Sequence, residues 1–154
     1  MTPADFDLHD LHAALDARRA TLGLTWAALA AEFGVSAGTL RGLGERRSAE
    51  GDGVLRAIAW LGRTPESFVP GAGGGTPLPT PAAALRFDAG SLYAALEAAR
   101  AGRGLTWTAV AADCGAGSPF ALTRLRDGGR VRFPEVMRVL AWLGAPAARF
   151  VRVG

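Results

Sequence analysis

Lysine is absent from the sequence, so its 17 basic residues are all arginine. The one cysteine, Cys114, excludes a disulfide within the chain and fits a reducing compartment. The sequence also lacks an apolar run long enough to span a membrane, and its acidic N-terminus is unlike a signal peptide. We therefore expect a cytoplasmic protein that does not enter a membrane. The apolar fraction of 49% predicts a folded chain rather than a disordered one.

Signatures of catalysis and of metal binding are likewise missing. Serine, histidine and aspartate all occur, but no nucleophile motif, glycine-rich phosphate loop or cluster of metal ligands brings them together. His9 and His12 have the spacing of one helix face, yet two histidines without a cysteine or suitably placed carboxylates make a poor metal site. We expect no enzyme activity, no cofactor and no bound metal.

What the sequence does contain is an internal repeat. Trp26 and Trp107 lie 81 residues apart, as do the stretches "AALD" at 13–16 and "AALE" at 94–97. Further along the chain the offset becomes 82, since "AWLG" occurs at 59–62 and again at 141–144. The sequence is therefore a duplication, with one extra residue in its second copy between Gly115 and Leu122.

Glycine and proline mark the boundary between the two copies. The stretch "PGAGGGTPLPTPAAA", residues 70–84, resists helix and strand alike. We expect a first domain over 1–70 (the first copy), a linker over 71–84 and a second domain over 85–154 (the second copy). A flexible linker of this length averages roughly 20 Å from end to end and stretches to about 45–50 Å.

The two copies differ in charge. Residues 1–69 carry 7 arginines against 9 acidic residues, which gives −2, whereas residues 82–154 carry 10 arginines against 5 acidic residues, which gives +5. A polyanion is therefore expected to be attracted more strongly to the second copy.

Apolar residues recur at helical spacing through each copy. In the first copy they predict three successive short helices, with N-caps at Asp7, Thr25 and Ser36. Gly34 is expected to end the second of these helices by adopting a positive φ. Leu8, Leu11, Leu15 and Leu22 follow the helical spacing in the first helix, and the inward faces of the next two helices are expected to carry Trp26, Leu29, Ala30, Phe33, Leu40 and Leu43.

Two further helices are predicted before the linker. A loop over 44–53 precedes a fourth helix that ends at Gly62, and Thr64 caps a short fifth helix with Pro65 at its first position. Alternating patterns and β-branched runs, which are typical of strands, are almost lacking. We therefore expect an all-α fold, with two tandem five-helix domains joined by the Gly/Pro-rich linker. The four tryptophans and Cys114 are expected in the cores.

The second and third predicted helices of each copy are joined through a glycine, as in a helix-turn-helix. With "LRAIAWLG" and "PESF" downstream, "LTWAALAAEFGVSAGTLRGL" resembles the phage-repressor-type (lambda-repressor-like, xenobiotic-response-element) helix-turn-helix family. "LTWTAVAADCGAGSPFALTRL" with "VMRVLAWLG" resembles a second member, so the resemblance covers nearly the whole chain except the linker. It implies that the third helix of each copy reads bases in the major groove of DNA.

On this resemblance, the candidate DNA contacts of the first copy are mostly small. They are Ser36, Thr39 and Arg41 on the third helix, followed by Arg46 and Arg47, which suit phosphates. Acidic neighbours of these arginines, such as Glu45, are expected to weaken their attraction for DNA.

The matching positions of the second copy carry larger and more basic side chains. Arg124 is expected to pair with guanine, and Phe120 to lie against a thymine methyl group. The full set of candidate contacts is Ser118, Phe120, Thr123 and Arg124 on the third helix, and Arg126, Arg130 and Arg132 along the phosphate backbone. The second copy is therefore expected to read DNA better than the first.

Three functions remain open on the sequence. The first is a nucleoid-associated, sequence-specific transcriptional regulator, whose copies act as a pseudo-dimer on half-sites about 34–36 Å apart. The second is a protein-interaction module, in which the acidic first copy binds another protein or a second chain and only the second copy, or neither, binds DNA. The third is a structural protein that binds DNA without sequence preference. The arginines of the second copy also admit a simpler interpretation, a solvated face of an arginine-rich protein.

Overall fold

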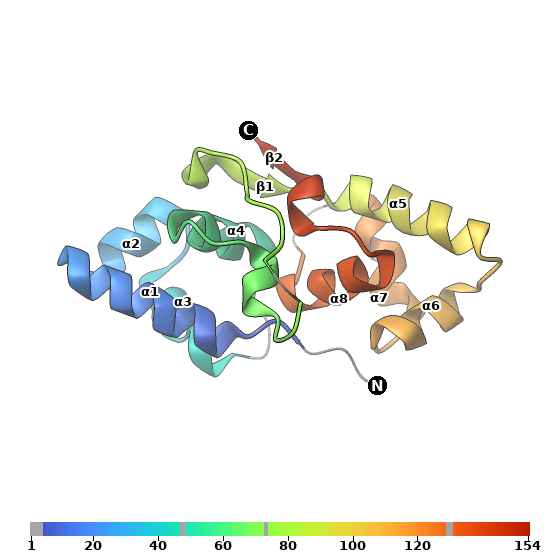
Figure 1. The fold of residues 1–154 in the computed structure, drawn as a ribbon, viewed down its shortest axis with the longest axis horizontal. Coiled ribbons are helices and arrows are strands. Elements are labelled where there is room, and N and C mark those ends of the chain that lie inside the picture. The colour runs from blue at the N-terminus through green and yellow to red at the C-terminus, as the bar shows by residue number, and fades with distance from the viewer. Residues whose placement is uncertain (1–4, 47–48, 73, 129–130) are drawn as a thin grey trace.

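The computed structural model describes residues 5–46, 49–72, 74–128 and 131–154. These residues form a mostly helical fold with eight α-helices, five 3-10 helices and two short strands (Figure 1). The first copy contains α1 (Leu8–Leu22), α2 (Trp26–Phe33), α3 (Ala37–Arg41), η1 (Leu43–Glu45), α4 (Gly51–Trp60) and η2 (Pro65–Phe68). The second copy repeats this order with α5 (Ala89–Gly102), α6 (Trp107–Cys114), α7 (Pro119–Thr123), η4 (Arg124–Asp127), α8 (Phe133–Leu143) and η5 (Ala147–Phe150).

Local signals begin and end the first helices as the sequence predicts. The side chains of Asp7, Thr25 and Ser36 each accept a hydrogen bond from the backbone N–H three residues further on, at 2.9–3.1 Å. Gly34 has φ of +70° and ends α2, and Gly115 has φ of +71° and ends α6. These turns require a left-handed conformation that a side chain would strain.

One predicted boundary was wrong, and the predicted short fifth helix is present as a 3-10 turn. The stretch 51–53 was expected in a loop, but it forms the first turn of α4 because the Glu50 carboxylate accepts hydrogen bonds from the N–H groups of Asp52 and Gly53, both at 3.1 Å. The predicted fifth helix is a single 3-10 turn, Pro65–Phe68, although Thr64 caps it as expected at 3.2 Å.

The all-α prediction missed a small antiparallel sheet. β1 (Leu85–Phe87), preceded by η3 (Ala82–Ala84), pairs with β2 (Val151–Val153), with Leu85 opposite Val153. The alternation in "LRF" and "VRV" was a strand signal, but three residues are too few to distinguish a strand from a loop.

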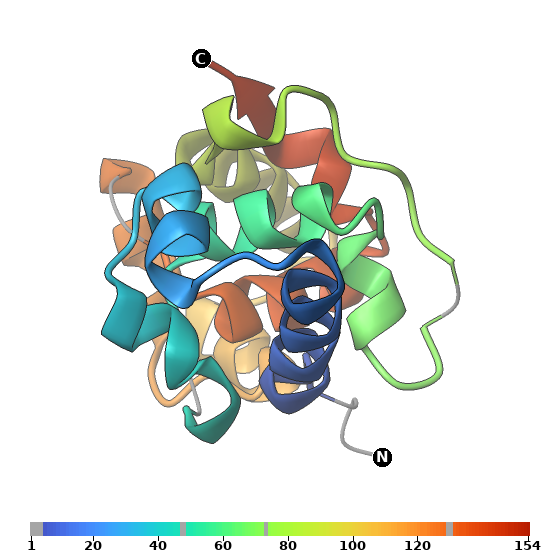
Figure 2. The same ribbon diagram turned by 90° about the vertical axis from the view of Figure 1, so that its left-hand side faces the viewer.

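The buried apolar residues of both copies belong to one hydrophobic core. α4 and α8 lie toward the middle of the molecule, with α1–α3 at one end and α5–α7 at the other (Figure 1). Phe6 of the first copy packs edge-on against Phe133 of the second, with ring centroids 4.9 Å apart. The segment between the copies is mostly exposed and runs along the outside of the molecule (Figure 2).

Equivalent residues of the two copies pair with each other. The N–H of Gly51 donates to the carbonyl of Val131 at 2.8 Å, and the N–H of Phe133 donates to the carbonyl of Ala49 at 2.9 Å. Between these bonds Glu50 and Arg132 face each other in an antiparallel bridge. Residues 131–133 are the repeats of residues 49–51 at the offset of 82. The segment 49–51 therefore pairs with its own repeat.

The residues that lead into the first helix of each copy contact the other copy. The Arg138 guanidinium on α8 makes two hydrogen bonds to the Asp5 carboxylate, at 2.7 and 3.0 Å, which lowers the pKa of that carboxyl. In the other direction, Arg56 on α4 donates to the Leu85 carbonyl at 3.1 Å. Each lead-in segment thus contacts both copies.

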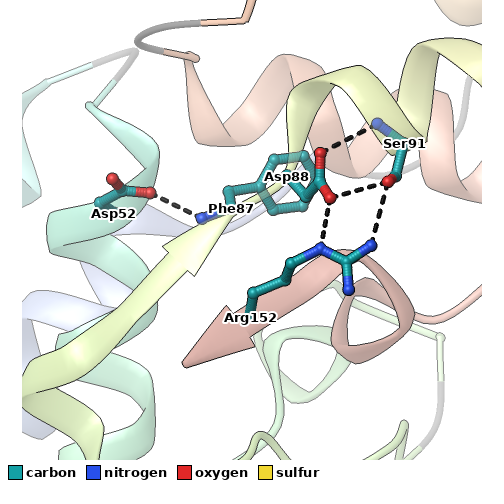
Figure 3. Close-up of polar contacts among 5 residues, drawn as sticks. All are labelled: Asp52, Phe87, Asp88, Ser91 and Arg152. Atoms are coloured by element: carbon teal, nitrogen blue, oxygen red, sulfur yellow. Dashed lines mark hydrogen bonds and ion pairs between the residues drawn. The ribbon is translucent and has the colours of Figure 1, made fainter. Parts of the chain in front are cut away.

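The junction of β1, β2 and α5 shows these contacts most closely (Figure 3). Asp52 on α4 accepts a hydrogen bond from the Phe87 N–H at 2.8 Å. Asp88 caps α5 through the N–H of Ser91 at 3.0 Å and also binds the Arg152 guanidinium of β2. The Ser91 N–H and the Arg152 guanidinium together lower the pKa of Asp88 to about 2.

Cys114 and the tryptophans belong to the core as expected, but Cys114 is more deeply buried than the tryptophans. Cys114 is 4% exposed, and burial raises the pKa of its thiol to about 11. The four tryptophans are half-buried at the edge of the core, and each has an arginine guanidinium over its ring. The apolar stems of these arginines cover the rings from solvent.

Candidate nucleic-acid interface

The helix α3 presents small side chains to solvent. A three-residue turn, 34–36, separates it from α2. Leu40, 3% exposed, anchors the inner face of α3, while Ser36, Gly38 and Arg41 lie on the exposed side. Thr39 is half-buried and its hydroxyl accepts a hydrogen bond from that of Ser36 at 2.7 Å.

The equivalent helix α7 presents larger side chains. A four-residue turn, 115–118, joins it to α6, so the extra residue of the second copy lies in this turn. Leu122 is buried like its counterpart in α3, while Phe120 is 71% exposed and Arg124 is exposed at the C-terminal end of the helix. A single exposed apolar side chain is common on a protein surface, so Phe120 does not by itself indicate a surface that contacts another molecule.

A pocket of about 790 Å³ lies between α3 and α7. Thr39 and Ala121, which are equivalent positions of these helices, both line it, and so do the paired residues Glu50 and Arg132. The pocket therefore lies where the two copies meet, and α3 and α7 flank it from opposite sides.

The arginines of this region sit beside carboxylates. Glu135 on α8 lies 3.4 Å from Arg124 and 3.9 Å from Arg132, and Asp127 lies 3.7 Å from Arg126. All three arginine side chains are 46–66% exposed, so these ion pairs are weak and open to competition from another anion.

The structure brings together some of the predicted contact residues and separates others. Thr39, Arg46, Arg124 and Arg132 line the pocket. The remaining described candidates lie on the surrounding surface, exposed except for the half-buried Thr123, and they are Ser36, Arg41, Ser118, Phe120, Thr123 and Arg126. Arg47 and Arg130 lie outside the described residues.

Two carboxylates of this site escaped the sequence analysis. Glu50 caps α4 and faces Arg132, and Glu135 holds two arginines that were expected to meet DNA. A signal for Glu135 was present, because its i,i+3 spacing from Arg132 fits an ion pair on one helix face. The contacts between the copies have no local signal, since they join residues from 29 to 133 positions apart.

No group of three or more histidine, cysteine, aspartate or glutamate side chains in the described part of the chain is placed to hold a metal ion. His12, one of the two histidines weighed for such a role, stacks on Trp26 with ring centroids 5.2 Å apart. None of the described helices combines the length and the apolarity that crossing a membrane requires.

No family model, no curated protein and no solved structure matches this chain.

Proposed function

We propose that this protein is a sequence-specific regulator of transcription that binds double-stranded DNA. In this proposal α2–α3 and α6–α7 are two helix-turn-helix units, α3 and α7 read bases in the major groove, and the two copies act as a built-in pseudo-dimer. The chain would bind as a nucleoid-associated protein of the cytoplasm.

The observation that carries the proposal is the pair of equivalent exposed helices on either side of one pocket. α3 and α7 each follow a glycine turn, each bury a single leucine, and each keep an arginine exposed at or after their C-terminal end. Exposed arginines next to a short helix suit a duplex, because guanidinium groups pair with guanine edges and with phosphates. The charge of +5 on the second copy favours that half as the stronger partner.

A second function, a protein-interaction module, is favoured by the acidic groups of the site. Glu50, Asp127 and Glu135 all line the pocket, and the first copy carries a net charge of −2. Carboxylates at this position repel phosphates and attract a basic segment of another protein or of a second chain.

Selection of bound duplexes from a random pool by the full chain separates these functions. A regulator enriches a consensus and binds it about 10³-fold or more tightly than unrelated duplex at physiological salt. Binding with steep salt dependence and little sequence preference would instead identify a structural DNA-binding protein. A chain that retains no duplex would leave the interaction module as the better account.

A charge-matched pair of variants makes the selection specific to the proposed surface. Arg124→Ala combined with Arg126→Ala removes two exposed arginines beside α7 and should abolish enrichment. Arg86→Ala combined with Arg149→Ala removes two exposed arginines of the same copy from β1 and η5 and should leave enrichment in place. Equal losses in both variants would mean that only net charge matters.

A further inference from the structure

The contacts between the copies have the pattern that a two-fold axis produces. A two-fold rotation makes residue i contact residue j and the repeat of i contact the repeat of j. Gly51 bonds to Val131 and the repeat of Gly51, Phe133, bonds to the repeat of Val131, Ala49. The repeats η2 and η5 also contact each other, as expected for elements beside such an axis.

The same axis relates the two lead-in segments. Arg138 on α8 binds Asp5, which precedes α1, and its repeat Arg56 on α4 binds Leu85, which precedes α5. A tandem arrangement related by translation would place one copy's α4-type helix against a different element of its neighbour. The antiparallel pairing of 49–51 with 131–133 excludes an arrangement by translation for the described residues.

We propose that one chain reads an inverted two-part DNA site whose halves are unequal, a strict half under α7 and a permissive half under α3. This inference rests on the proposed function and specifies its target. Because the site mirrors the symmetry of the protein, two units related by a two-fold axis meet two half-sites in opposite orientations. A linker of this length allows a direct repeat equally well, so the orientation follows from the contact between the copies and not from the chain length.

The inequality of the halves follows from equivalent positions on the two helices. Position 38 is glycine and its repeat, position 120, is a phenylalanine that is 71% exposed. Position 42 is glycine and its repeat is Arg124. A glycine offers no side chain for a base edge, whereas phenylalanine can contact a thymine methyl and arginine can pair with guanine. α7 therefore discriminates among sequences at positions where α3 does not.

The orientation is tested on duplexes built from the selected consensus. One duplex keeps both parts as selected, a second reverses one part so that the two become a direct repeat, and a third replaces the permissive part with unrelated sequence. We expect the full chain to bind the reversed duplex at least ten-fold more weakly than the selected one, measured by fluorescence anisotropy. Equal binding to the selected and reversed duplexes would overturn the inverted arrangement.

The inequality is tested with one variant on α7 and a control variant on α5. Phe120→Ala should broaden the strict half of the consensus and leave the permissive half as it was. Gly102→Ala on α5 should leave both halves unchanged, since a Cβ at Gly102 meets no described atom within 4 Å. Loss of preference in the permissive half for Phe120→Ala, or in neither half, would contradict the assignment of the strict half to α7.

The outcomes separate this inference from the function beneath it. A random pool from which the chain enriches nothing refutes the proposed function itself. An enriched consensus that has a single part, or two parts of equal strictness, or two parts in direct orientation refutes only the inverted, unequal site. Both results come from the same selection with the full chain, so neither depends on folding of an isolated half.

Discussion

The two copies make closely similar contacts around the tryptophan that begins α2 or α6. Arg19 donates to the Leu24 carbonyl at 2.9 Å and lies over the Trp26 ring, 4.8 Å from its centroid. Arg100 makes the equivalent bond to the Leu105 carbonyl at 2.9 Å and lies 5.2 Å from the Trp107 centroid. On the outward positions of α3 and α7, by contrast, glycine faces phenylalanine and arginine across the repeat.

This contrast separates the residues that packing requires from those that are available to contact a partner. The arginine that pairs with a carbonyl in the turn between two helices and covers a tryptophan is needed in both copies, because an unpaired buried carbonyl costs about 1–3 kcal/mol. The outward positions carry no such requirement, so differences between the copies accumulate there. A pair of copies with equal frameworks and unequal surfaces fits one chain that reads two different half-sites.

The largest effect is expected from removing the guanidinium that distinguishes α7. Arg124→Ala should lower affinity for the selected duplex about ten- to a hundred-fold and relax preference at one base pair, since a bidentate pair with guanine is worth about 1–3 kcal/mol. Arg41→Ala on α3 should lower affinity less and by a similar factor for all sequences. Anisotropy titrations of both variants check the difference, and equal effects would show that the surfaces are not unequal.

The contact between the copies can be disturbed at one glycine. A Cβ on Gly51 would lie 2.5 Å from Val131 Cγ2, a branched side chain with little room to move. Gly51→Ala should therefore destabilise the fold by about 1–3 kcal/mol. Urea denaturation measures the loss.

Gly102→Ala on α5 is the matched control for this prediction. A Cβ there meets no atom of the described residues within 4 Å, and alanine favours helix over glycine by about 0.5–1 kcal/mol. The control should be stabilised or unchanged. If Gly51→Ala is as stable as Gly102→Ala, the two copies do not approach each other as closely as described.

The helix caps of the two copies should differ in strength. Asp88→Ala should cost more than Asp7→Ala at pH 6, where losing a cap costs about 1 kcal/mol, because Asp88 also binds the Arg152 guanidinium. The pKa of Asp88 is about 2 in the folded protein, below the value of about 3.9 in an unfolded chain. The carboxylate therefore stabilises the fold above about pH 4, and this contribution is lost as the pH falls toward 2.

Urea denaturation of wild type and Asp88→Ala at pH 6 and pH 2.5 checks the sign. The difference in free energy of unfolding between the two proteins should shrink at the lower pH. A difference that stayed constant or grew on acidification would mean that the ion pair with Arg152 contributes nothing.

The smallest effect is expected at the carboxylate that competes for the arginines of α7 and its neighbour. Glu135→Gln should raise affinity for duplex by up to about five-fold, because exposed ion pairs are worth about 0.2–1 kcal/mol. The gain should diminish as salt is added. Glu97→Gln, which breaks the 2.6 Å ion pair with Arg100 on α5, is the control and should leave affinity as it is.

Helices and their ends were predictable because their signals are local. Ser36 caps α3 through an N–H three residues away, and Gly34 turns the chain at a single position. The sequence did not predict the short strands, the first turn of α4 or the position of Glu135 beside Arg124. Each of these depends on a distant partner or on a signal of only three residues. The DNA contacts proposed for α3 and α7 stay a prediction.

The sequence by itself determined the repeat, most of the helix boundaries and the unequal chemistry of α3 and α7, since most of these depend on residues within a few positions of one another. Only the tertiary structure decided that the copies meet through residues 49–51 and 131–133, and hence that α3 and α7 flank one pocket. A linker of 14 residues allows either orientation at nearly the same entropy. The choice is made by hydrogen bonds and apolar contacts between residues about 80 positions apart, which no local pattern encodes.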